Sequence, residues 1–158
     1  MHHDKVDEVD IQILKTLQTH GRTKRNELAE SVKLSIPAVS ERLRKLEERG
    51  VIRSYNTVLD ARKLGLGLTA FIFLTTESSS YYKQILENAL AHSEILECHA
   101  VTGDGSHLLK IKTLSTETLE KLLSQIQSWP GVTNTRTNVV LSSPKEDTAI
   151  SLVHLEAH

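Results

Sequence analysis

Residues 27–50 read ELAESVKLSIPAVSERLRKLEERG, and this stretch decides the fold of the N-terminal part of the chain. Two short helical patterns are separated here by a tight turn that ends at Ser35. Ser35 is a preferred N-cap residue, Pro37 suits the first turn of a helix, and Gly50 suits the left-handed position that closes one. We therefore predict a helix over residues 36–49.

This predicted helix has an apolar side and a polar side. Val39, Leu43 and Leu46 recur at helical spacing and are predicted to pack inward, onto the helices before them. The opposite side is predicted to project outward, and it carries Pro37, Ala38, Glu41, Arg42, Arg44 and Lys45. Two short helices joined by such a turn are typical of a helix-turn-helix, whose second helix lies in the major groove of DNA.

The outward residues have expected roles against DNA. Ala38 is predicted to meet a thymine methyl group and Arg42 a guanine. Phosphate contacts, which position a helix without reading sequence, are predicted for Ser35, Ser40, Arg44, Lys45 and Arg49. The predicted surface also includes Arg22, Lys33, Pro37 and Glu41. Charge and periodicity alone leave one alternative open, a solvated helix in a packed bundle with Glu41 and Lys45 as an i, i+4 pair.

The distribution of charge supports a polyanionic partner. The chain has 158 residues and a net charge of -1, whereas residues 21–53 hold nine Lys or Arg against five acids, a charge of +4. Cys98 is the one cysteine, and it is predicted to be a buried apolar residue in a reducing cytoplasm. No apolar run reaches the length of a membrane span, and no catalytic residue, metal site or cofactor is predicted.

Two helices are predicted before this one and a sheet after it. The first helix runs from Val6 to a stop at Gly21, and the second follows Thr23 as its N-cap. The second half has the order strand, helix, strand, strand, helix, strand, which is the signature of a ferredoxin-like fold. The predicted strands are residues 68–76, 95–101, 108–113 and 132–141, the helices are residues 80–92 and 116–128, and the hairpin turn is residues 103–106.

One face of this sheet is predicted to be covered by both helices and the other by a second subunit. The helices carry apolar stripes at Tyr81, Ile85, Leu86, Ala89 and Leu90, and at Leu119, Leu122, Leu123 and Ile126. The face that needs a partner is predicted to carry Phe71, Phe73, Ile95, Leu109 and Ile111 or their neighbours.

Several stretches, in this order, resemble the leucine-responsive and asparagine-responsive regulators, the Lrp/AsnC family. They are VDEVDIQIL (6–14), ELAESVKLS (27–35), ERLRKLEERGVI (41–52), LDARKLG (59–65), VTGD (101–104) and WPGVTNTRTNVVL (129–141). The resemblance spans nearly the whole chain. It implies an α+β fold class, with an N-terminal winged helix-turn-helix domain followed by a ferredoxin-like (βαββαβ) domain for ligand sensing and oligomerisation. The expected bounds are a DNA-binding domain over 1–53, a linker strand over 54–67, and a second domain over 68–158, whose residues 149–155 could add a strand.

The resemblance also implies partners. They are double-stranded DNA, further copies of the chain as a dimer and as an octamer built from four dimers, and an amino-acid effector bound between dimers. The effector residues implied are Thr102, Gly103, Asp104, Gly105, Ser106, His107, Thr135 and Thr137. Many members have Gly-Asp-aromatic-Asp-aromatic where residues 103–107 are GDGSH, so a second carboxylate and both rings are missing here, and the effector is expected to be changed or lost. Spacing alone fits Thr135 and Thr137 equally well as ordinary strand residues. Lys33 stands where the family usually has Gly.

Two other functions stay open. Some haem-biosynthesis decarboxylases share this architecture and act on a tetrapyrrole, and His99, His107 and Arg136 would take that role here. The two histidines could also begin a metal site, but no carboxylates or thiols converge on them. Alternatively, the chain is a ligand-sensing or heteromeric partner whose oligomer, rather than its own DNA contacts, does the regulating, or it is an oligomeric regulator that needs no effector.

Overall fold

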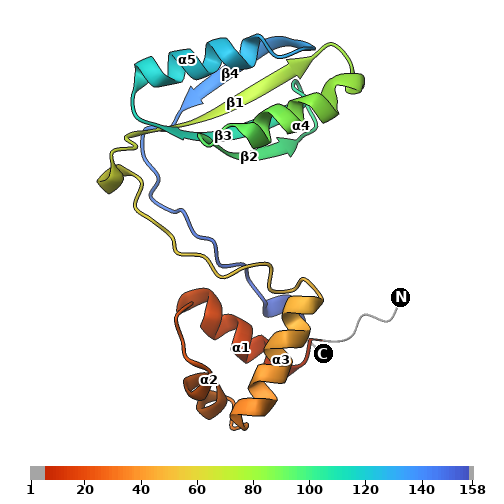
Figure 1. Ribbon diagram of the computed structural model, residues 1–158, viewed down its shortest axis with the longest axis vertical. Helices are drawn as coiled ribbons and strands as arrows, with labels where there is room; N and C mark the ends of the chain where they lie inside the picture. Colours follow the sequence, from red (N-terminus) through yellow and green to blue (C-terminus); the bar gives the residue numbers. More distant parts are fainter. Residues whose placement is uncertain (1–5, 157–158) are drawn as a thin grey trace. The chain divides into compact units, whose positions relative to one another are not determined.

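The computed structural model describes residues 6–156 (Figure 1). It divides into two compact units. One is made from the two ends of the chain, Met1–Val58 with Lys145–His158, and the other is Leu59–Pro144. We call them the helical unit and the sheet unit.

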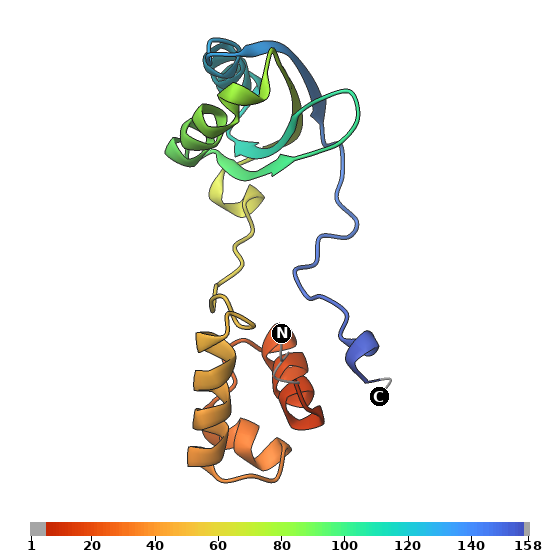
Figure 2. The same ribbon diagram turned by 90° about the vertical axis from the view of Figure 1, so that its right-hand side faces the viewer.

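The helical unit contains α1 (Glu8–Thr19), α2 (Arg25–Ser31) and α3 (Ile36–Glu48), which are drawn in red to orange in Figures 1 and 2. The start of α1 is well capped, because Asp7 accepts a hydrogen bond from the backbone N–H of Asp10 at 2.8 Å and the Asp10 side chain accepts one from the N–H of Asp7.

The start of α2 lies one residue later than predicted. Its N-cap is Lys24, not Thr23, and the Thr23 hydroxyl instead donates to the carbonyl of His20 at 2.6 Å. A threonine hydroxyl can donate to a free carbonyl at the end of one helix or accept from a free N–H at the start of the next, and the sequence does not distinguish these uses.

The prediction for the inward side of α3 is confirmed. Ser35 is the N-cap and accepts a hydrogen bond from the N–H of Ala38 at 3.3 Å, and Gly50 has a φ of 69° just beyond the helix. Val39, Leu43 and Leu46 are buried. They pack against apolar residues of the neighbouring helices, so the orientation of α3 in the helical unit is set by this apolar stripe.

The sheet unit is a four-stranded antiparallel sheet with two helices, as the predicted ferredoxin-like fold requires. Its strands are β1 (Leu68–Thr76), β2 (Ile95–Ala100), β3 (His107–Thr113) and β4 (Val132–Val139), in the spatial order β2-β3-β1-β4. Its helices, α4 (Tyr82–Ala91) and α5 (Thr116–Gln127), lie on one face of the sheet (Figures 1 and 2).

The two faces of the sheet differ from the prediction at β3. Leu109 and Ile111 were expected on the open face, but both are fully buried with Ile72 under the helices. Phe71 and Phe73 alternate with Ile72 and lie on the open face as predicted, and both are only half-buried. Alternation shows which residues share a face, but it does not show which face the helices cover.

The apolar stripe of α4 is narrower than predicted. Ile85 and Ala89 are buried in the core, whereas Leu86 is exposed and Leu90 is 78% exposed. The helix therefore contacts the sheet along a single line of residues. In α5 the prediction is confirmed, because Leu119, Leu122 and Ile126 are buried and Leu123 packs against them.

Two segments expected as strands form no strand. Residues 54–67 have no ladder partner within the described chain, and Arg62–Leu64 form a 3-10 helix. A strand needs a paired neighbour, which the sequence pattern cannot supply. Residues 149–155 do not join the sheet either. They belong to the helical unit, where Val153–Leu155 form a 3-10 helix, so the expected second domain over 68–158 loses its last residues to the first.

Candidate nucleic-acid interface

The outward side of α3 is open to solvent, as the groove-docking prediction requires. Pro37, Glu41, Arg44 and Lys45 are exposed, while Ala38 and Ser40 are partly buried. Arg44 is held by two carboxylates of its own helix: Nη2 donates to Oε1 of Glu41 at 2.7 Å, and Nη1 pairs with Glu48. Ion pairs this exposed to solvent contribute little to stability, so a phosphate can displace them at little cost.

Arg42 was predicted to contact guanine, but in this structure its side chain is engaged within the helical unit. Its Nη1 donates to Oδ2 of Asp7 at 2.7 Å and to Oδ1 of Asp10 at 2.9 Å. The residue lies on the flank of α3 that faces α1, where the capping carboxylates of α1 are close enough to bind it. Arg42 therefore joins α3 to the start of α1.

The electrostatics of this group support the same role. The hydrogen bonds to Asp7 and Asp10 raise the pKa of the Arg42 guanidinium above its ordinary value. Burial raises the pKa of the Asp7 carboxyl, but the hydrogen bonds from the Asp10 N–H and from Arg42 outweigh it, so the pKa is lowered overall. The Asp10 side chain is only 10% exposed. Removal of Arg42 would therefore cost more stability than the loss of a surface ion pair, because it would leave a nearly buried carboxylate without its cation.

The turn before α3 contains an unusual backbone conformation. Lys33 has a φ of 56°, which is the left-handed region, and its side chain is exposed. A non-glycine residue in this region costs roughly 1 kcal/mol. Lys33 and Arg22 were both predicted to add a basic group to the DNA-binding surface. Both side chains are exposed, which is compatible with these predictions.

Two residues near α3 were not singled out from the sequence. Arg25 lies at the start of α2 and donates from Nη1 to Oγ of Ser40 at 3.3 Å, which places a guanidinium beside α3. Tyr55 donates from its hydroxyl to Glu47 at 2.7 Å, and burial followed by this carboxylate raises its pKa to about 12. The basic character of Arg25 was visible in the sequence, but its proximity to Ser40 depends on how α2 and α3 pack.

The predicted effector turn is closely packed on β1. The N–H of Ser106 donates to the carbonyl of Leu74 at 2.7 Å, and its Oγ donates to the same carbonyl at 3.3 Å. A Cβ added to Gly105 would lie 2.8 Å from the same oxygen, so this turn has no room for the aromatic residue of other members. Thr102, Gly103 and Asp104 are exposed at the tip.

Of the other predicted effector residues, His107 lies next to this turn, with its Nδ1 2.9 Å from Oγ of Ser106. His107 is buried on the helix side of the sheet, where its ring meets Tyr82 edge-on at 4.6 Å between centroids. Desolvation lowers the pKa of His107. Thr135 accepts a hydrogen bond from Gln127 at 3.0 Å, and Thr137 pairs with Ile72 on the same face. The structure thus gathers residues 102–106 at one turn but places the remaining three residues beneath or beside the helices.

The residues considered for catalysis or metal binding do not converge. His99 and His107 lie on opposite faces of the sheet, since His99 pairs with Leu108 in the register and Ala100 with His107. Arg136 stacks over the ring of Phe73 at 4.7 Å, on the open face. Among residues 6–156 no three His, Cys, Asp or Glu side chains are grouped to hold a metal ion. In the same part of the chain, no helix has the length and apolar character to cross a membrane.

Comparison with known proteins gives both units a family. Residues 6–53 match the winged helix-turn-helix DNA-binding family, and residues 69–150 match the Lrp/AsnC ligand binding domain. The HTH-type transcriptional regulator FL11 of Pyrococcus horikoshii is 35% identical over 93% of this chain and 97% of its own length. The leucine-responsive regulatory protein of Escherichia coli is 35% identical over 89% of this chain and 88% of its own length.

Solved structures agree with these relatives. A transcriptional regulator from Neisseria meningitidis in complex with L-Met superposes with a TM-score of 0.89 at 32% identity, covering 94% of this chain and 98% of that one. A feast or famine regulatory protein from M. tuberculosis complexed with L-methionine has a TM-score of 0.83 at 30% identity, covering 92% and 98%. The relatives are named as regulators and not as enzymes, and the open side of α3 is the surface that a helix-turn-helix uses. The chain therefore belongs to the Lrp/AsnC family of DNA-binding transcriptional regulators.

Proposed function

We propose that this regulator binds specific, pseudo-palindromic DNA in the cytoplasm as a dimer or larger oligomer, with one α3 helix of each copy in the major groove. The observation that carries the proposal is the division of α3 into two sides. Val39, Leu43 and Leu46 are buried, whereas Arg44 and Lys45 face solvent. In a two-fold dimer the two recognition helices would lie about 34 Å apart, one turn of the duplex.

The proposed contacts follow from where each side chain lies. The N-terminal turns of α3, with Pro37 and Ala38, would approach base edges, because this end of a recognition helix enters the groove. Arg44 and Lys45 would exchange their pairing with Glu41 for phosphate oxygens. Phosphate or flanking contacts are proposed for Ser35, Ser40, Arg22, Lys33 and Arg49 as before, with Arg25 added and Arg42 removed.

A second copy of the chain is the proposed cover for the open face of the sheet. Phe71 and Phe73 leave apolar area on that face, and Arg136 stacks on one of the rings. Apolar rings beside a guanidinium are common in subunit interfaces. Phe73→Asp should shift the sedimentation coefficient toward a monomer, whereas Ser124→Asp on the exposed part of α5 should not. Equal effects of the two changes would remove this part of the proposal.

An amino acid is the proposed effector, between dimers that assemble into an octamer. The support comes from the two L-methionine complexes among the similar structures. In this chain the exposed carboxylate of Asp104 is the candidate partner for the ammonium group, at the tip of a turn with no second carboxylate. A thermal-shift screen of the twenty amino acids tests this, since a ligand at a hundred times its Kd stabilises by about 2.7 kcal/mol. Asp104→Asn should abolish the shift, and a shift that survives this change would place the effector elsewhere.

DNA binding itself is tested by a salt titration. We would measure fluorescence anisotropy of a duplex from the region upstream of the chain's own gene, at several salt concentrations. Arg44→Ala with Lys45→Ala should weaken binding and reduce the slope of log K against log salt by about 1.8, since each lost phosphate contact removes about 0.9. Lys83→Ala with Lys121→Ala removes the same charge from exposed positions of the sheet unit and serves as the control. If both pairs change the slope equally, α3 is not the DNA-binding surface.

A further inference from the structure

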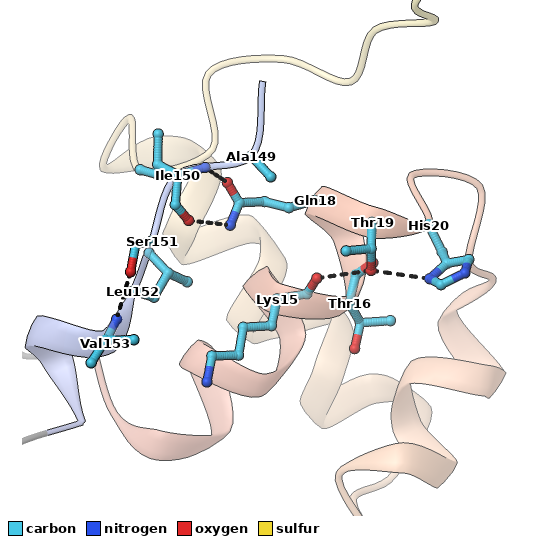
Figure 3. A pocket seen from close by; sticks show the side chains of 10 residues that line it. All are labelled: Lys15, Thr16, Gln18, Thr19, His20, Ala149, Ile150, Ser151, Leu152 and Val153. Carbon is cyan, nitrogen blue, oxygen red and sulfur yellow. Dashed lines mark hydrogen bonds between the residues drawn. The ribbon is translucent and has the colours of Figure 1, made fainter. Parts of the chain in front are cut away.

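The end of the described chain is bound to α1 by hydrogen bonds with its backbone (Figure 3). The side-chain amide of Gln18 donates to the carbonyl of Ile150 at 3.0 Å and accepts from the N–H of the same residue at 2.7 Å. Lys15 forms an ion pair with Glu156 further along. A groove of about 520 Å³ remains between α1 and this segment, lined by both. Two points on α1 therefore hold residues 150–156 along the helix.

Between those two points, Leu152 enters the core of the helical unit. Its side chain is 8% exposed and belongs to one apolar cluster with Ile11 and Leu14 of α1 and Leu46 of α3. Its neighbour Val153 is 66% exposed. Since Leu46 is on the inner side of the proposed recognition helix, Leu152 completes the packing between α1 and α3.

This segment is also the direct continuation of the sheet unit. The edge strand β4 carries Thr135 and Thr137 and ends at Val139, and residues 140–148 join it to the segment on α1. The chain therefore passes between the two units twice, once after α3, where it enters the sheet unit, and once before Leu152, where it returns to the helical unit.

We propose that residues 149–156 are a clamp that holds α1 against α3, and that docking of this clamp controls the DNA affinity of the regulator. The inference rests on the proposed function for its DNA-binding half only. When the clamp is docked, α3 is held by contacts from both ends of the chain. When it is released, the α1–α3 cluster loses Leu152 and α3 is less well ordered for the groove. Because the clamp follows β4, a change at that strand can reach α3 through the clamp.

The first test measures the clamp without DNA. Hydrogen exchange of the full chain is followed by mass spectrometry for Leu152→Ala, Gln18→Ala and Val153→Ala. Loss of a buried leucine should speed exchange of the amides around Leu14 and Leu46 by about 30-fold, and loss of the Gln18 amide by about 5-fold. Val153→Ala is the control and should leave the exchange rates of these amides unchanged. In all three variants, the amides of β1 and β3 should exchange as in the unchanged chain. Similar exchange in Leu152→Ala and Val153→Ala would overturn the clamp.

The second test measures control of DNA affinity. Gln18→Ala should weaken DNA binding several-fold with the same salt slope as the unchanged chain, because neither Gln18 nor the clamp is among the proposed phosphate contacts. Gln18→Ala is used here because Leu152→Ala could unfold the helical unit. If Gln18→Ala speeds exchange in α1 but leaves DNA affinity unchanged, the proposed control of DNA affinity is wrong, while the proposal that residues 149–156 hold α1 against α3 stands. An unchanged chain that does not bind DNA would overturn the proposed function, whatever the exchange data show.

Discussion

Arg42→Ala should destabilise the helical unit without removing a DNA contact. The change leaves the Asp10 carboxylate, 10% exposed, with the N–H of Asp7 as its hydrogen-bond donor at 3.2 Å. Removing one partner of a fully buried pair costs about 3–5 kcal/mol, and an exposed pair contributes about 0–1 kcal/mol. The Arg42 side chain is 31% exposed, which places this pair between the two limits, at about 1–3 kcal/mol. For a unit of this size, 2 kcal/mol corresponds to a fall in Tm of about 8–16 °C.

The assay compares Arg42→Ala with Arg44→Ala. Circular dichroism at 222 nm follows the helices of both units during thermal unfolding. Fluorescence of Trp129 identifies the transition of the sheet unit, because this buried residue belongs to its core, and the remaining transition is that of the helical unit. Arg42→Ala should lower the Tm of the helical unit and leave the salt slope of DNA binding unchanged. Arg44→Ala, whose side chain is 52% exposed, should do the reverse and reduce the slope by about 0.9.

A second substitution sharpens the test. In the Arg42→Ala chain, adding Asp10→Asn should recover part of the lost stability, because no buried carboxylate is then left without its cation. The same change in the unaltered chain should be destabilising. The reasoning is refuted if Arg42→Ala leaves the Tm unchanged and reduces the salt slope by about 0.9, which is the behaviour of a phosphate contact.

Three further predictions concern the backbone and the buried histidine. Lys33→Gly should stabilise the helical unit by about 0.5–1 kcal/mol in urea unfolding, because φ is 56° there, whereas Lys33→Ala should not. Gly105→Ala should destabilise the sheet unit by about 1–3 kcal/mol, since its Cβ would lie 2.8 Å from the Leu74 carbonyl oxygen, and an unchanged urea midpoint would contradict this. Burial lowers the pKa of His107, so the sheet unit should be fully stable above pH of about 6.5 and lose stability as the pH falls toward the lowered value. His107→Gln should flatten that profile, and an equally steep profile in the variant would assign it to another group.

The elements of the fold could be predicted because their signals are local. The strand over Leu68–Thr76 has the predicted bounds, and Ser35 caps α3 as expected. Helical spacing and capping residues depend on neighbours a few positions away, which the sequence shows directly. The width of an apolar stripe is different, because it depends on how closely a helix approaches the sheet. For this reason Leu86 and Leu90 were predicted to be buried and are exposed.

The parts of the site that could not be predicted depend on distant pairs. Arg42 is 32 residues from Asp10, and nothing in the spacing of the two residues indicates that they meet. Gln18 is 132 residues from Ile150, and an amide that binds backbone groups has no preferred sequence partner at all. The effector residues were implied by the family resemblance and not by spacing, and the resemblance could not show that His107 faces the helices.

The position of Leu152 has a consequence for the order of folding during synthesis. The sheet unit is one continuous segment, so its core can close while the ribosome is still translating the residues that follow it. The helical unit emerges first, yet the cluster that joins Ile11 and Leu46 stays incomplete until Leu152 has left the exit tunnel. Closing that long loop is entropically unfavourable until the inserted segment is compact. The domain made first is therefore expected to be the last to acquire its full stability, and a stalled nascent chain that ends before Leu152 should present α3 on an unfinished core.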